Sequence, residues 1–321
     1  MNDFIIPEVV EASSDFNGRY FPLERAKTLQ ANFAMMFSIH LGCLKSDEYF
    51  ESEVLVLTGP SGAGKSREMN QLLTKFGASG SLLPSGMPAK MVKCVLDRKV
   101  TWMSLGKRTL KAMKFDLAEN ARMTQIEIWD QVATQARLQG IVAIHYDETQ
   151  HILAGKKDIA VEEILDCFKS LLKSTSWPLM LILSGVPELN LYVPEFEQLA
   201  RKVTQVTFED IDYDKEALQV SEIVQNYALR AELEVDDDLL SEDFIHRLIT
   251  AGAFRWGLVF SITKKAVMVA LEDRSLALRR EHYVAMWVNK TKMNHAATPF
   301  THEAYETVFR RDAPYKASIP T

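Results

Sequence analysis

Eight residues that follow a short apolar run constrain this chain more than any other part of its sequence. The run is Val54–Leu57, and the residues after it fit the pattern G-x-x-x-x-G-K-[ST] throughout. They are Gly59, Pro60, Ser61, Gly62, Ala63, Gly64, Lys65 and Ser66. Glycines let backbone N–H groups curl around a phosphate without Cβ clashes, and a following helix adds the positive end of its dipole. The pattern therefore predicts a phosphate-binding loop between a buried strand and a helix.

Two side chains of this loop are expected to contact the ligand directly. Lys65 should reach the β and γ phosphates, and the Ser66 hydroxyl should bind Mg²⁺. A guanine-reading Asn/Thr-Lys-x-Asp motif is not found in the sequence. We therefore expect a purine nucleoside triphosphate, ATP, together with magnesium.

A second apolar run, Ile141–Asp147, is followed by another acid, Glu148. At the end of a strand beside a phosphate loop, Asp147 can hold the magnesium shell and Glu148 can orient and polarise the attacking water. The alternative is two solvated acids at a strand end. His145 and Tyr146 interrupt the aliphatic pattern, so we expect this end of the strand to be less buried than the rest.

Strands and helices alternate up to about residue 210, which predicts an α/β fold with a parallel sheet flanked by helices. A strand at Met91–Leu96 lies between the phosphate loop and Asp147, which favours the P-loop division that has an additional strand. The remaining strands are expected at Leu179–Ser184 and Val203–Phe208. We expect residues 1–50 to lead into the core and residues 51–210 to form it. Residues 211–321 should form an α-helical lid and tail.

The expected helices follow apolar residues at helical spacing, while residues 1–22 are expected to be irregular and no strand is expected after Asp210. These helices are Leu23–Leu41, Lys65–Phe76, Thr101–Met113, Thr124–Gln139, Asp158–Ser174, Lys215–Leu229, Ser241–Thr250, Arg255–Leu271, His282–Lys290 and Thr301–Arg310.

Three further polar residues are candidates for contact with the γ-phosphate or the attacking water. Ser184, at the tip of a strand, could hydrogen-bond the water, or it could be a simple strand-end turn. Arg201 and Arg255 carry the guanidinium group best suited to fork onto phosphate oxygens. Both arginines could instead be surface charges, and Lys202 competes with Arg201 for the same role.

One segment is basic although the chain has a formal net charge of −6. It is the best candidate for contacts with a nucleic-acid backbone, with a solvated helix face as the alternative. Lys107, Lys111 and Lys114 are spaced to share one helix face, and Trp102 could stack on a base or sugar. The candidate residues are Lys99, Trp102, Lys107, Arg108, Lys111 and Lys114.

Composition narrows the class of protein further. The three cysteines Cys43, Cys94 and Cys167 form no metal-type pair, so we expect reduced structural thiols in a cytoplasmic protein. No apolar run of 18 residues and no signal peptide are found, so no membrane contact is expected. The seven histidines show no metal-binding spacing.

These motifs, in this order, resemble an AAA+ ATPase. Gly59–Ser66 matches the Walker A motif, and Ile144–Glu148 matches the Walker B motif. Ser184 is at the position of sensor 1, Arg201 is in the arginine-finger region, and Arg255 is at the position of sensor 2. Within that superfamily the chain resembles the transposon-encoded TniB/TnsC type, the ATP-dependent regulators of transposition targets. The segments that carry this likeness are Tyr20–Arg25, Asp147–Leu153, Leu183–Leu189, Leu199–Lys202 and Phe254–Gly257.

The resemblance implies a bacterial ATPase, slow and stimulated by DNA or partners, that assembles on duplex DNA as a ring or filament of identical subunits. It implies that the protein links a target-selecting protein to a DDE-type transposase in DNA recombination. It places Phe21 close to the adenine, Arg201 in the neighbouring subunit's site and the Lys107–Lys114 segment on DNA. Two alternatives stay open: a nucleotide-dependent scaffold with little hydrolysis, and an AAA+ ATPase of secretion or replication initiation.

Overall fold

The chain folds into two compact units, which are described separately. The computed structural model describes residues 5–18, 20–46, 48–96, 101–117, 123–153, 158–199, 202–309 and 311–316. The core unit contains residues 22–61 and 65–208, and the helical unit contains residues 1–21, 62–64 and 209–321.

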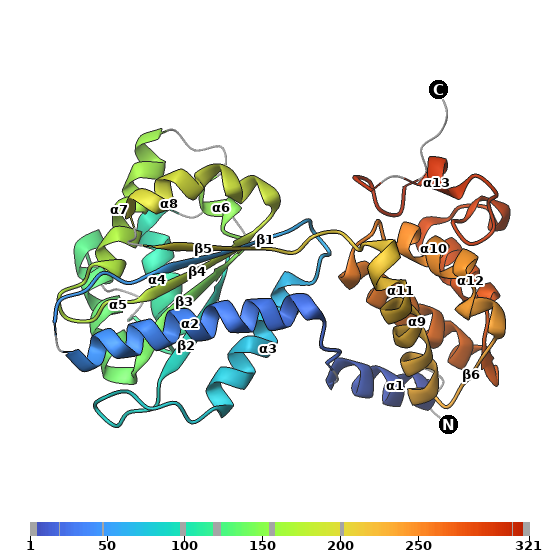
Figure 1. Cartoon of the computed structure of the whole chain (residues 1–321), viewed down its shortest axis with the longest axis horizontal. Coiled ribbons are helices and arrows are strands. Elements are labelled where there is room, and N and C mark those ends of the chain that lie inside the picture. Colours follow the sequence, from blue (N-terminus) through green and yellow to red (C-terminus); the bar gives the residue numbers. More distant parts are fainter. Residues whose placement is uncertain are drawn as a thin grey trace. The chain divides into compact units, whose positions relative to one another are not determined.

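A five-stranded parallel sheet in the order β2-β3-β4-β1-β5 is the centre of the core unit (Figure 1). The strands are β1 (Val54–Thr58), β2 (Lys90–Val95), β3 (Ile141–Asp147), β4 (Met180–Gly185) and β5 (Val203–Thr207). All five were expected from the sequence, with ends that differ by one residue or none. Because β4 lies between β1 and β3, the strand that ends in Asp147 is not adjacent to the strand that precedes Gly59. This order confirms the additional-strand P-loop division.

Helices flank the sheet of the core unit (Figure 1). Thr124 and Glu127 form the expected capping box at the start of α5, and Gly140 ends that helix at a left-handed φ of 72°. The described helices of this unit are α2 (Glu24–Ser46), α3 (Lys65–Ala78), α4 (Trp102–Ala112), α5 (Gln125–Gln139), α6 (Gln150–Leu153), α7 (Asp158–Leu172) and α8 (Val193–Leu199), with a 3₁₀ turn at Pro187–Tyr192.

The strand β3 is buried along its whole length. The expectation of a less buried end is therefore wrong, because both polar side chains find partners inside the core. Tyr146 OH hydrogen-bonds Thr109 Oγ1 of α4 at 2.9 Å, and His145 Nε2 hydrogen-bonds Ser184 Oγ of β4 at 2.8 Å. A hydrogen bond to a buried polar group removes most of the free-energy cost of taking that group out of water.

The helical unit differs from the sequence expectations at three places. Pro7–Gly18 forms helix α1 rather than an irregular segment, and it buries Ala12 and Phe16. Two short strands, β6 (Glu234–Val235) and β7 (Ala277–Leu278), pair in parallel although no strand was expected after Asp210. The last helix, α13, spans only Tyr305–Val308. The other helices are α9 (Tyr213–Arg230), α10 (Glu242–Ala251), α11 (Trp256–Glu272) and α12 (Arg280–Thr291), with 3₁₀ turns at Asp237–Leu240 and His295–Ala297.

Two of the earlier expectations concern properties of the whole chain. No helix among the described residues is long and apolar enough to cross a membrane. Cys94 and Cys167 are buried and Cys43 is half-buried, and all three thiols are free.

Candidate functional site

The carboxyl ends of β1, β3 and β4 bring the main candidate residues to one edge of the sheet. Thr58 pairs in register with Gly185, and Asp147 pairs with Ser184. Parallel strands end on the same side, so the loop after β1, the acids Asp147 and Glu148 at the end of β3 and Ser184 on β4 lie at neighbouring positions. Ligand sites of open α/β sheets form at this edge.

The loop that begins at Gly59 has the backbone that its glycines predict. Gly62 and Gly64 adopt left-handed φ angles of 84° and 99°, which side chains with a Cβ rarely adopt. Lys65 begins α3, is buried, and donates from Nζ to the carbonyl oxygens of Gly59 at 2.6 Å and Pro60 at 3.1 Å. The Lys65 ammonium is therefore held inside the loop, where phosphate oxygens could replace the two carbonyl oxygens as its hydrogen-bond partners. Ser66 follows in the first turn of α3 and is half-buried.

Asp147 accepts hydrogen bonds from three directions. The Ser184 hydroxyl donates to Oδ1 at 2.7 Å, the backbone N–H of Glu148 donates to Oδ1 at 3.2 Å, and Lys93 Nζ pairs with Oδ2 at 2.9 Å. Burial raises the pKa of this carboxyl, but the charge that His145 gains at low pH, the hydrogen bonds from Lys93 and Ser184 and the charge of Lys93 outweigh it and hold the pKa at about 2. Asp147 is an anion that already faces a cation, which fits a ligand of Mg²⁺.

His145 fixes the proton arrangement of this cluster. Burial lowers the pKa of His145 to about 3, so the ring is neutral at physiological pH. Ser184 gives its single proton to Asp147, so its oxygen must accept from His145 Nε2–H. This chain of hydrogen bonds makes Ser184 a support for Asp147, whereas its expected contact with the attacking water stays a prediction.

Lys93 is a site residue that the sequence analysis did not single out. It lies on β2 beside His145 on β3, and its ammonium bridges Asp147 and the Asn70 side chain of α3, each at 2.9 Å. A lysine within an apolar strand gives no sign of its partner until the strand order is known. The Lys93 ammonium contacts Asp147 Oδ2, so a magnesium ion that binds Asp147 would compete with Lys93 for this carboxylate.

Replacing Lys93 with Met should therefore lower the Mg²⁺ concentration needed for half-maximal nucleotide binding, by about 5-fold for a partly buried pair worth about 1 kcal/mol. The measurement is nucleotide-binding fluorescence titrated with Mg²⁺. Lys90→Met, at the exposed start of the same strand, is the matched control. An unchanged or higher Mg²⁺ requirement in the Lys93 variant would contradict this role.

Glu148 has a strained backbone, with a left-handed φ of 61°. Such angles are uncommon for residues other than glycine and often occur at functional sites. Its carboxylate accepts a hydrogen bond at Oε2 from Gln150 Nε2. The water-polarising role expected of Glu148 remains a proposal, and this geometry is compatible with it.

The candidate arginines and Phe21 are only partly described. Arg201 and Lys99 lie outside the described residues. Arg255 immediately precedes α11 in the helical unit, and its guanidinium donates to the carbonyl of Arg311 at 2.7 Å. Phe21 packs against Tyr227 and Phe260 of the same unit, with ring centroids 5.2 and 5.6 Å away. Their expected contacts with the nucleotide stay predictions.

The basic segment is built around α4. Lys107 and Lys111 are exposed on this helix, and Arg108 is half-buried. Lys114 falls beyond the helix end at a left-handed φ of 58°, so the prediction that it shares one helical face is wrong. Trp102 packs against Trp129 with ring centroids 5.0 Å apart, so one part of its surface is already covered.

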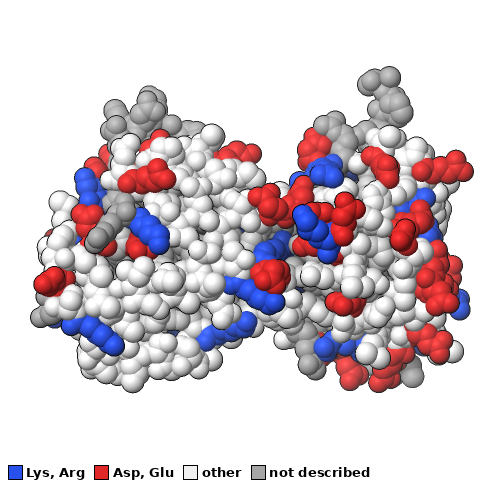
Figure 2. Space-filling model, viewed as in Figure 1, with Lys and Arg blue, Asp and Glu red and all other residues white. Residues whose placement is uncertain are grey.

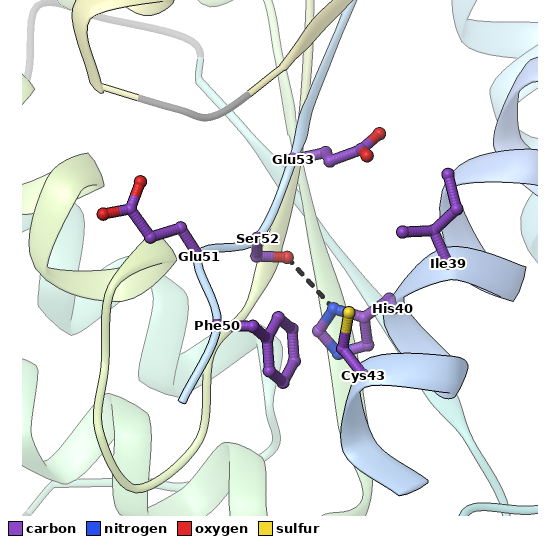
Figure 3. A pocket seen from close by; sticks show the side chains of 7 residues that line it. All are labelled: Ile39, His40, Cys43, Phe50, Glu51, Ser52 and Glu53. Atoms are coloured by element: carbon purple, nitrogen blue, oxygen red, sulfur yellow. Dashed lines mark hydrogen bonds between the residues drawn. The ribbon is translucent and has the colours of Figure 1, made fainter. Parts of the chain in front are cut away.

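A separate cavity of about 260 Å³ lies between the end of α2 and the segment before β1 (Figure 3). His40 hydrogen-bonds Ser52 there at 3.0 Å, and burial lowers the pKa of His40 to about 4. The cavity precedes β1 at its amino end, whereas Gly59 follows its carboxyl end. It is therefore not part of the nucleotide site.

Comparisons with known proteins agree with this geometry. Residues 48–193 match the family described as AAA domain. The fold is similar to Cdc6p of Pyrobaculum aerophilum, with a TM-score of 0.61 and 14% identity over 86% of this chain and 70% of that one. It is also similar to ORC1 of Aeropyrum pernix in complex with DNA, with a TM-score of 0.60 and 16% identity over 84% of this chain and 66% of that one.

A third similar structure, ORC2 of Aeropyrum pernix with ADPNP and ADP, has a TM-score of 0.55 and 12% identity over 88% of this chain and 72% of that one. No curated protein matches the chain in sequence. The described structure is an AAA+ P-loop NTPase fold with a helical C-terminal region. None of these matches is a transposition protein, so the TniB/TnsC resemblance is not confirmed.

Proposed function

We propose that this chain, an AAA+ P-loop NTPase fold with an AAA domain at residues 48–193, hydrolyses ATP to control its own assembly on duplex DNA. The observation that carries the proposal is the cluster at one edge of the sheet: the Gly59–Ser66 loop, the anionic Asp147 and the strained Glu148. A protein that uses ATP only as a structural ligand does not need a water-orienting acid. The presence of Glu148 therefore favours hydrolysis over the scaffold alternative.

Each residue of the cluster has a distinct proposed task. The loop N–H groups and Lys65 bind the phosphates, and Ser66 and Asp147 would hold Mg²⁺, which neutralises charge on the β and γ phosphates. Glu148 polarises the attacking water. Lys93 and Ser184 keep the Asp147 carboxylate anionic and oriented, and the neutral His145 holds the Ser184 hydroxyl in place. We propose that Arg201 of a neighbouring copy contacts the γ-phosphate and that Arg255 and Phe21 contact the nucleotide within one chain.

Duplex DNA is the proposed polyanionic partner. Asp and Glu side chains gather over the helical unit on the face shown in Figure 2, which disfavours phosphate contacts there. The exposed Lys107 and Lys111 of α4, with Lys114 just beyond it, offer positive charge on the core unit. The structure of ORC1 in complex with DNA shows that a protein of similar fold binds DNA, which supports this proposal.

Neutralising Lys107, Lys111 and Lys114 together to Gln should weaken DNA binding equally for all sequences, because phosphate contacts carry no base information. The salt dependence of binding should flatten by about 0.9 in log–log slope for each lost contact. The measurement is DNA-binding anisotropy at several salt concentrations.

The matched control for this prediction changes the same number of exposed lysines elsewhere on the core unit, Lys45, Lys75 and Lys90. It corrects for the general loss of positive charge. If the two triple variants show the same salt slope, the α4 segment is a solvated surface and DNA binds elsewhere.

Two cellular settings fit this activity. The similarity to Cdc6p and ORC1 supports an AAA+ ATPase of the replication-initiation type. The segments Asp147–Leu153 and Leu183–Leu189 support the transposition regulator, with a DDE-type transposase and a target-selecting protein as partners. A preference for particular DNA sequences would favour the first, and uniform coating of any duplex would favour the second.

Electron microscopy with duplex DNA tests the proposed function as a whole. We expect ordered rings or filaments with ATP or a non-hydrolysable analogue and none with ADP. The same samples report ATP turnover. Particles that stay monomeric with every nucleotide would contradict the assembly proposal, and assembly without turnover would restore the scaffold alternative.

A further inference from the structure

Gln150 links the two strand ends on which the proposed reaction depends. It is the first residue of α6, two positions after Glu148, and it is half-buried. Its side-chain Nε2 donates to Glu148 Oε2, and its Oε1 accepts a long hydrogen bond of 3.4 Å from the backbone N–H of Val186, just after β4. One amide group thus spans from the Glu148 carboxylate to the end of the strand that carries Ser184.

Gly185 makes room for this amide. A Cβ built on Gly185 would lie 2.5 Å from Gln150 Oε1, a distance that real Cβ atoms do not adopt, and its next neighbour would be Leu189 Cδ2 at 3.2 Å. The φ angle of Gly185 is not in the left-handed region, so glycine is not required there for its backbone conformation. The close approach of Gln150 is the strongest steric reason for a glycine at this position.

The chemistry of an amide suits a neighbour of a general base. Nε2 can only donate, so the Glu148 oxygen that it contacts accepts the hydrogen bond. One carboxylate oxygen is then occupied and the other is left for a water. The peptide that follows Glu148 is held as well, because Thr149 N–H donates to the Ser184 carbonyl at 2.8 Å.

We propose that Gln150 is a positioning residue that holds the Glu148 carboxylate toward the attacking water and ties it to the end of β4. This inference rests on the proposed ATPase function. Gln150 does not touch the substrate in this proposal, and it acts only through Glu148.

The central experiment is a double-mutant cycle of Gln150→Ala and Gly185→Ala, with kcat, KM for ATP and thermal unfolding measured for each variant. Gln150→Ala should lower kcat about 10-fold to 100-fold, as expected for a lost hydrogen bond to a charged group, with KM nearly unchanged. Gly185→Ala should lower kcat similarly because its Cβ displaces the amide. The double variant should be no slower than Gln150→Ala alone, since the clash disappears with the amide.

Two controls separate this role from a general effect on the fold. Gly77→Ala adds a methyl group in α3, where no atom lies within 4 Å of the new Cβ. Gln139→Ala removes another amide, at the end of α5, whose hydrogen bond to Gln135 lies on the same helix. Both variants should keep the parent kcat.

A third variant, Gln150→Glu, keeps the length of the side chain but replaces the donating amide nitrogen with a carboxylate oxygen, which repels the Glu148 carboxylate. Gln150→Glu should therefore lower kcat at least as much as Gln150→Ala, with KM for ATP nearly unchanged. A loss of kcat without a change in KM or in thermal unfolding is a readout that a purely structural role would not give.

The outcomes distinguish the inference from the function on which it rests. Parent kcat in Gln150→Ala, losses that add in the double variant, or parent kcat in Gln150→Glu would each overturn the positioning role. In those cases a parent protein that hydrolyses ATP and a Glu148→Gln variant that does not would leave the proposed function intact. A parent protein that never turns over ATP would overturn both.

Discussion

Glu148→Gln is expected to stop ATP turnover while ATP still binds. The substitution removes the base and keeps the shape of the side chain, and a positioned general base contributes about 10²–10⁴-fold to a rate. Nucleotide contacts through Gly59–Ser66 and Asp147 are left in place, so the affinity for ATP should change by less than about 2-fold, the scale of a surface substitution. Such a variant should also remain assembled on DNA for longer, because the step that resets the complex is blocked.

The measurement combines phosphate release, nucleotide titration and dissociation from DNA. Glu188→Gln is the matched control, since this exposed carboxyl follows β4 and makes the same change of charge. Turnover at the parent rate in Glu148→Gln would remove Glu148 from the reaction and return it to a solvated acid at the end of a strand.

Lys65→Ala is expected to abolish ATP binding at ordinary concentrations. The variant loses the cation that the loop already holds through the carbonyls of Gly59 and Pro60. Hydrogen bonds from a charged group to phosphate oxygens are worth about 1.5–3 kcal/mol each, so the affinity should fall about 100-fold or more. Titration calorimetry with ATP is the measurement.

Lys75→Ala, an exposed lysine near the other end of α3, is the control for Lys65→Ala. It should bind ATP like the parent protein. Unchanged ATP affinity in Lys65→Ala itself would mean that the loop does not bind the triphosphate in the expected way. The assignment of the nucleotide site would then have to be abandoned.

The sequence predicted the core unit well because its signals are local. The strands β1, β3 and β4 are short, mainly apolar runs. The capping box at Thr124 and the left-handed Gly140 mark the two ends of α5 without reference to anything else. Predictions failed where tertiary packing decides the structure. Helix α1 has only a weak apolar pattern and packs on α11, and the two-residue strands β6 and β7 exist only because they meet each other.

The same distinction applies to the candidate site. Gly59–Ser66 and Asp147–Glu148 are contiguous motifs, so their residues can be named from the sequence. Lys93 and His145 acquire their roles only because β2, β3 and β4 are neighbours, which no local pattern reveals. In the sequence, Gln150 was noted only as part of Asp147–Leu153, one of the segments that resemble the TniB/TnsC type. Its hydrogen-bond partner Val186 lies 36 positions away in the chain.

The central place of β1 in the sheet has a consequence for how the protein is made. Both neighbours of β1, the strands β4 and β5, come from residues 180–207, so the strand before Gly59 has no partner in the sheet until the ribosome has passed Gly185, the end of β4. At typical synthesis rates of about 5–20 residues per second, this takes roughly 6–25 s after Thr58 is made. During that time an apolar segment is open to chaperones and to aggregation. The phosphate loop, although encoded early, can form only late in the folding of the core unit.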